Sequence, residues 1–119
     1  MVVEYLRESD VYEELEIGGT EYVLVHAGPA NTVPYREIWE YELHDLVWER
    51  PDYHKDLFPG KKVIMGHTPT QSLPEAERPG YIYRCNNNIV IDCGCGLPNG
   101  RLGCMRLEDG AEFYVEKEA

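Results

Sequence analysis

The sequence lacks any hydrophobic run that could cross a membrane, because no segment approaches the roughly 20 apolar residues that a membrane helix needs. It also lacks an apolar signal region at its start, where residues 1–10 include Glu4, Glu8 and Asp10. We therefore expect a cytoplasmic protein that has no membrane partner.

Basic residues are scarce. The chain has 11 Lys and Arg against 22 Asp and Glu, a formal net charge of −11. A nucleic-acid interface needs clustered Lys and Arg to neutralise phosphates, so we expect no nucleic acid as partner. An anionic substrate would need a local positive centre, which a metal ion or a well-placed arginine supplies.

Cysteines are few and spaced unlike a zinc knuckle. Cys85, Cys93, Cys95 and Cys104 do not form the two C-x2–4-C pairs that structural zinc sites use. In a reducing compartment they should be free thiols or metal ligands. Cys85 and Cys93 flank or lie in expected buried strands, which favours packing in the core. A small zinc-binding domain on these cysteines stays open as an alternative.

Two apolar runs that end in a histidine dominate what is present. Residues 21–26 and 62–66 are rich in β-branched and aliphatic side chains, and each leads into a Gly/Pro turn, which predicts buried strands. His26 and His67 then lie at strand ends, and neutral imidazole is the commonest metal ligand. The residues alone leave two readings equally open: a shared metal site, or two histidines with ordinary structural partners.

The remaining pattern predicts an α+β domain, because a helix, a hairpin and a second helix precede a run of strands. Length favours one domain. Gly18-Gly19 is a two-residue hairpin signal, and Pro51 should end the second helix near Arg50. The expected segments are helices over 2–14 and 35–48, strands over 15–17, 81–84 and 89–92, a surface loop over 68–80, and a hairpin of 102–107 with 111–115.

Arg50 is the candidate for holding an anion, because a guanidinium is the natural clamp for phosphate. Its position at the expected end of a helix also fits an ordinary solvated arginine beside the negative end of the helix dipole. The two other histidines, His44 and His54, are expected on the surface.

Five blocks, in order, resemble the C-terminal half of the bacterial calcineurin-like metallophosphatases. Within that family the chain is most similar to the serine/threonine phosphoprotein phosphatases and their diadenosine-tetraphosphatase relatives. The blocks cover residues 25–28 (VHAG), 46–50 (LVWER), 65–70 (MGHTPT), 88–94 (NIVIDCG) and 100–107 (GRLGCMRL).

The resemblance implies a β-sandwich flanked by helices and hydrolysis of phosphate esters by a pair of divalent metals, manganese, iron or zinc. It implies that His26 and His67 are ligands of the second metal and that Arg50 holds the substrate phosphate. The implied substrate is a phosphoprotein or a dinucleotide polyphosphate.

The family motifs GDxHG, GDxxDRG and GNHE do not occur in the chain. They supply the first metal's ligands, the bridging aspartate, an asparagine of the second metal and the catalytic acid. We therefore expect residues 1–119 to form a single incomplete domain, a truncated C-terminal half that binds metal weakly and hydrolyses little alone. The alternative is a non-catalytic interaction module that forms a homo-oligomer or pairs with a complementary N-terminal half.

Overall fold

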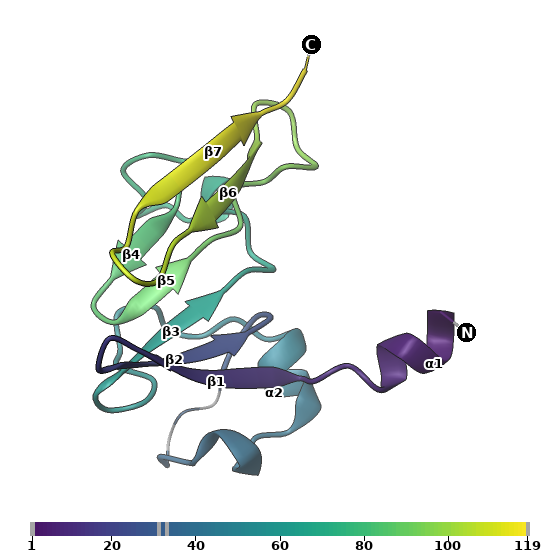
Figure 1. Cartoon of the computed structure of the whole chain (residues 1–119), viewed down its shortest axis with the longest axis vertical. Helices are drawn as coiled ribbons and strands as arrows, with labels where there is room; N and C mark the ends of the chain where they lie inside the picture. The colour runs from purple at the N-terminus through teal and green to yellow at the C-terminus, as the bar shows by residue number, and fades with distance from the viewer. Residues whose placement is uncertain (1, 31, 33, 119) are drawn as a thin grey trace.

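A mixed five-stranded sheet organises the molecule (Figure 1). The computed structural model describes residues 2–30, 32 and 34–118. Within them β2, β3 and β5 run parallel, and the antiparallel strands β1 and β4 form the two edges. The strands, in sheet order, are β1 (Tyr12–Ile17), β2 (Thr20–Val25), β3 (Lys61–Met65), β5 (Asn88–Val90) and β4 (Tyr83–Cys85).

The hairpin predicted at Gly18-Gly19 is confirmed. Both glycines have positive φ, +58° and +83°, as the two-residue turn between β1 and β2 requires. The helix predicted over 2–14 is wrong beyond α1 (Val2–Arg7), because β1 already begins at Tyr12. Pairing of β1 along all of β2 gives the two strands a continuous ladder of backbone hydrogen bonds, and this outweighs the loose helical spacing of the apolar residues.

The long helix predicted over 35–48 is also wrong. This segment forms a short 3₁₀ helix, η1 (Ile38–Glu40), and one short α-helix, α2 (Leu43–Val47). Tyr41 between them is extended, with ψ 147°, and its ring is buried in the core. One continuous helix would have placed the apolar stripe on the core, yet Trp39 and Leu43 are 66% and 60% exposed.

The later segments follow the prediction with shifted ends. The expected loop over 68–80 contains a 3₁₀ turn, η2 (Thr70–Ser72), and its Thr68 and Thr70 are fully buried. The terminal hairpin is confirmed as β6 (Arg101–Met105) with β7 (Glu112–Glu116). It stacks beside β4 and β5 rather than extending their sheet (Figure 1).

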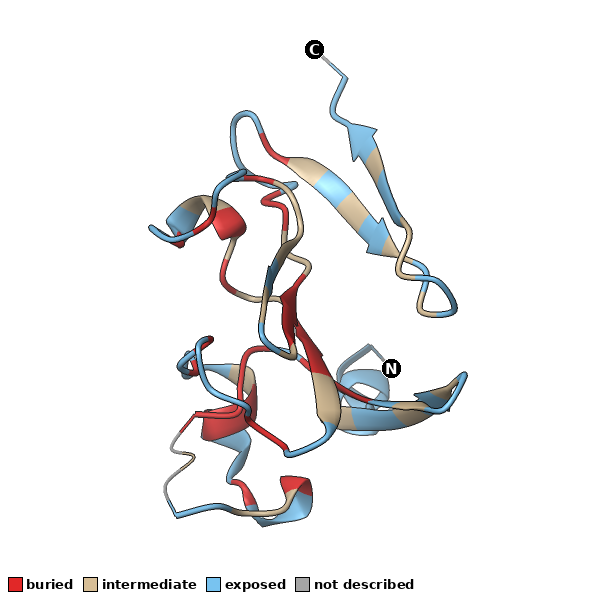
Figure 2. Ribbon diagram, turned by 90° about the vertical axis from the view of Figure 1, so that its left-hand side faces the viewer, coloured by how far each residue is buried: buried red, intermediate tan, exposed pale blue. Residues whose placement is uncertain are grey.

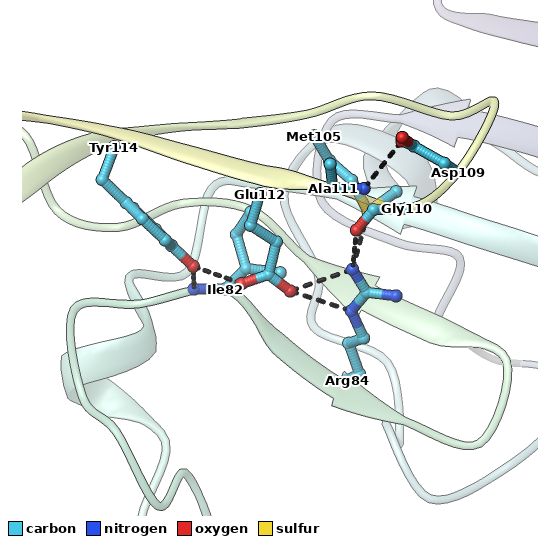
Figure 3. Close-up of polar contacts among 8 residues, drawn as sticks. All are labelled: Ile82, Arg84, Met105, Asp109, Gly110, Ala111, Glu112 and Tyr114. Carbon is cyan, nitrogen blue, oxygen red and sulfur yellow. Dashed lines mark hydrogen bonds and ion pairs between the residues drawn. The ribbon is translucent and has the colours of Figure 1, made fainter.

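Polar contacts attach this hairpin to the sheet (Figure 3). The Tyr114 hydroxyl accepts a hydrogen bond from the backbone N–H of Ile82 at 3.1 Å. Arg84 donates to the Glu112 carboxylate at 3.1 Å and to the Gly110 carbonyl at 2.8 Å. These bonds fix the position of β6 and β7 over β4 and β5.

The two faces of the sheet differ in how well they are covered. The helical face carries the main core, which includes Val63, Met65 and Leu57 and continues through η1, α2 and the loops around them. On the opposite face, the described residues form a smaller cluster with Tyr22, Ile64 and Ile89 buried at its centre and only partly buried side chains, among them Met105 and Leu107, packed around them. In the hairpin, β6 alternates between half-buried and exposed residues, whereas in β7 Tyr114 is half-buried and its four neighbours in the strand are exposed (Figure 2).

The observed architecture is a small α+β domain, mostly strands in mixed sheets with few helices. Among the described residues no helix is long and apolar enough to cross a membrane.

Candidate functional site

The carboxyl ends of the parallel strands β2 and β3 bring His26 and His67 together. Val25 pairs with Met65 in register, so His26 follows the end of one strand and His67 lies just beyond the end of the other. The Gly66 N–H donates to the His26 carbonyl at 2.8 Å, which continues the pairing one step past the strands. The His26 Nε2 and the His67 Nδ1 are 3.1 Å apart.

His67 has an unusual backbone conformation. Its φ is +68°, in the left-handed region that residues with a Cβ seldom adopt. The next residues are held firmly, since the Thr68 N–H donates to the Gly66 carbonyl and the Thr70 N–H to the Asp92 carbonyl. Residues in such conformations cluster at functional sites, where the surrounding structure imposes them.

The loop after β2 is pressed against α2. The N–H groups of Ala27 and Gly28 both donate to the Leu46 carbonyl, at 2.8 and 3.1 Å. A Cβ on Gly28 would lie 2.0 Å from the Asp45 carbonyl oxygen, so only glycine fits there. This close approach places the residues after α2 beside the histidines, and the ring centroids of Trp48 and His67 are 5.5 Å apart.

Arg50 lies beside His67 and Trp48. Trp48, Glu49, Arg50 and His67 line a cavity of about 470 Å³. The Glu49 carboxylate is 2.7 Å from the His44 Nε2, so it is already paired. Among the described residues none forms an ion pair with Arg50, whose side chain is exposed. A solvent-accessible guanidinium beside His67 suits an anionic ligand.

The geometry of the histidine pair fits part of a metal site. Two nitrogens bound to one ion at about 2.0–2.1 Å lie about 2.8–3.4 Å apart for angles between 90° and 109°. The 3.1 Å separation lies inside this range, and it is also the distance of a hydrogen bond between the two imidazoles. The pair therefore has the spacing of two ligands on one ion. Among the described residues no three His, Cys, Asp or Glu side chains are grouped to hold a metal, so the pair by itself does not complete a coordination shell.

Two residues near the site were missed in the sequence. Trp48 carries no chemistry of its own, and only its contact with His67 draws attention to it. Asp92 lies close to Gly66, because a Cβ added to that glycine would be 3.8 Å from the Asp92 Cβ. The Asp92 carboxylate accepts a hydrogen bond from the Gly94 N–H. A signal existed, because Asp92 follows the apolar run of residues 89–91 just as His26 follows its own.

The cysteines are all free thiols. Cys93 is 2% exposed, which confirms its packing in the core, and Cys85 is half-buried. Cys95 and Cys104 are exposed. The zinc-binding alternative stays a prediction, with no zinc-like grouping of these thiols among the residues described.

Comparison with protein-family models, curated proteins and solved structures finds no match to this chain.

Proposed function

We propose that this chain supplies part of a metal-dependent phosphoesterase centre of the serine/threonine phosphatase kind, set in part of a β-sandwich. His26 and His67 would hold one divalent metal, and Arg50 would hold the substrate phosphate. The observation that carries the proposal is the 3.1 Å separation of the two imidazole nitrogens at the ends of β2 and β3.

The chain's own residues have clear tasks in such a centre. His26 and His67 must present unprotonated nitrogens, so the proton between them has to leave when an ion binds. Trp48 packs against the His67 ring and restricts its orientation. Arg50 neutralises and orients the phosphate. A bound divalent pair would activate water and stabilise charge on the phosphoryl oxygens.

The centre needs groups that the described residues do not bring to it. Catalysis by two metals requires carboxylates that fill and bridge the coordination shells. The face of the sheet opposite the core leaves room for a complementary layer, since Leu24, Ile64 and Ile91 line an apolar groove of about 540 Å³ that reaches His26. A partner half that packed into this groove would lie next to the histidine pair.

An assay with manganese tests this function. The chain would be measured with p-nitrophenyl phosphate, alone and together with the N-terminal half of a family phosphatase. We expect little hydrolysis alone and a large gain on mixing, which His26→Ala or His67→Ala abolishes. His44→Ala is the matched control, since His44 is an exposed histidine away from the pair. Ordinary enzyme rates from the isolated chain would show that it is not incomplete. No gain on mixing would remove the support for a complementary half.

A non-catalytic interaction module is the second candidate. It is favoured by exposed apolar side chains, because α1 has no buried residue and projects away from the sheet (Figure 1). Val115 on β7 and Leu102 on β6 are cross-strand neighbours and are 64% and 57% exposed. Sedimentation at high concentration should then show self-association, and a strictly monomeric chain would count against this function.

A further inference from the structure

A cysteine, a histidine and a glutamate lie close together at the amino ends of the parallel strands, whereas the histidine pair lies at their carboxyl ends. Cys85 ends β4 and pairs with Asn88, which begins β5, so it lies at the amino ends of the parallel strands. The Cys85 Sγ is 3.3 Å from the His54 Nδ1. The other ring nitrogen, Nε2, is 3.8 Å from the Glu75 Oε1, an ion-pair distance longer than a hydrogen bond, and the His54 side chain is 63% exposed.

The turn after Cys85 holds His54 in place. Asn88 is 1% exposed, and both hydrogens of its amide donate to the chain on either side of His54, to the carbonyls of Tyr53 and Lys55 at 2.7 Å each. The Asn86 amide donates to the carbonyl of His54 itself. Side-chain bonds to three successive carbonyls fix this loop relative to β4, although His54 lies in a segment without regular structure.

We propose that Cys85 is a nucleophilic thiol that hydroperoxides oxidise, with His54 as its base and Glu75 as the group that orients the imidazole. The reactive form of cysteine is the thiolate, and a histidine within hydrogen-bond reach that is itself oriented by a third group is the usual means of producing it. This inference is independent of the phosphoesterase proposal, because it uses neither His26 nor His67.

The reaction balances with the groups present and one hydroperoxide. The thiol proton passes to the His54 Nδ1, and the sulfur attacks the terminal peroxide oxygen. An S–O bond forms while the O–O bond breaks, and His54 returns the proton to the departing oxygen as water or an alcohol. The sulfur loses two electrons to become a sulfenic acid, and the peroxide gains them.

A tyrosine and several charged residues also lie around the thiol and His54. The Tyr83 phenol hydrogen-bonds to Cys85, and burial followed by this bond raises its pKa to about 12. The carboxylates of Glu75 and Glu77 also act on Tyr83. Two charged residues near His54 in sequence form an ion pair with each other: the Lys55 Nζ is 4.0 Å from the Asp52 Oδ2.

Site-resolved alkylation tests the nucleophile. The full chain would be treated with iodoacetamide at pH 6.5, and the rate at each cysteine followed by peptide mass spectrometry. Cys95 and Cys104 are internal controls, since they are more exposed than Cys85. We expect Cys85 to react at least ~10-fold faster than either, because the His54 imidazole within hydrogen-bond reach can take the thiol proton as the sulfur attacks.

Substitutions separate activation from mere access. His54→Gln should bring the Cys85 rate down to that of Cys95, while His44→Gln should leave it unchanged. Asn86→Ala, which loosens the loop without touching the imidazole, should lower it by less. An unchanged rate in His54→Gln, or a Cys85 rate in the parent chain no faster than that of the exposed cysteines, would overturn the proposal.

Treatment with hydrogen peroxide followed by dimedone identifies the oxidised product. Labelling should appear first at Cys85 and should fall at least ~10-fold in His54→Gln. Labelling that appears equally at Cys95 would overturn the assignment of a hydroperoxide as the reactant.

Discussion

The two faces of the five-stranded sheet are made from the same strands, yet they are covered by the rest of the chain to different extents. On the helical face, Val63 and Met65 are covered by η1, α2 and loops, and both are at most 1% exposed. On the other face, Ile64 between them lines an open apolar groove. Strict alternation along β3 therefore sends one set of side chains into a complete core and the other toward a surface that the described chain only partly covers.

This difference bears on the histidine pair, which among the described residues has no third ligating side chain beside it. His26 follows the end of β2 and borders the open groove, so it lies where coverage by the chain stops. The covered face holds the loop and α2 that place Trp48 and Arg50. The described residues thus surround the histidine pair on one side, and under the proposed function a complementary half would supply the ligands on the side of the open groove.

The largest expected effect compares the same substitution on the two faces. Leu57 is 2% exposed in the main core, whereas Leu24 on β2 lines the groove. Leu57→Ala should lower the free energy of unfolding by about 2–5 kcal/mol, and Leu24→Ala by about 1 kcal/mol or less, since a partly hydrated side chain loses less burial. Urea unfolding measures both values. Equal losses would mean that the groove face is as well packed as the core.

A second prediction concerns the hairpin, which partly covers the open side. Burial and the hydrogen bond to Glu112 raise the pKa of Tyr114 to about 12, against about 10 for a tyrosine in an unfolded chain. The neutral phenol is favoured in the folded state, so its contribution to stability is complete below pH 10 and is lost as the pH rises toward 12.

Tyr114→Phe should therefore flatten the loss of stability between pH 10 and 12, as followed by urea midpoints across that range. Tyr5→Phe is the control, because Tyr5 is 74% exposed on α1. If stability fell equally steeply with pH in Tyr114→Phe and in the parent chain, the phenol would not link the hairpin to the sheet.

The smallest effect on stability is expected at the outer face of the hairpin. Leu102 and Val115 face each other across β6 and β7 and are exposed, so Leu102→Ser with Val115→Thr should change the free energy of unfolding by only about 0.5 kcal/mol. If these side chains drive self-association, the same variant should sediment as a smaller species than the parent at equal concentration. Unchanged sedimentation would place any self-association elsewhere.

Sequence reasoning predicted the elements whose signal is local. The glycine pair at 18–19 and the apolar runs of β2 and β3 determine turn and strands by themselves, and both were found. The helix over 35–48 failed because the chain is extended at Tyr41 and Glu42, where the Tyr41 ring packs into the main core, a contact between distant segments. The meeting of His26 with His67 followed from parallel strands, but the position of Trp48 and the Cys85–His54 contact depend on tertiary packing and have no local signal.

The central claim is that His26 and His67 act as two ligands of one divalent ion, and the four histidines of the chain allow a direct test. Manganese would be titrated into the full chain while the imidazole resonances are followed by NMR. His44 and His54 serve as controls, because each already has a carboxylate neighbour and could attract an ion by charge alone.

We predict that the resonances of His26 and His67 broaden together at the lowest manganese concentrations, before those of His44 and His54. His26→Ala should abolish the early broadening of His67, since one imidazole binds too weakly by itself. Equal broadening of all four histidines, or broadening of His67 that survives His26→Ala, would contradict the account.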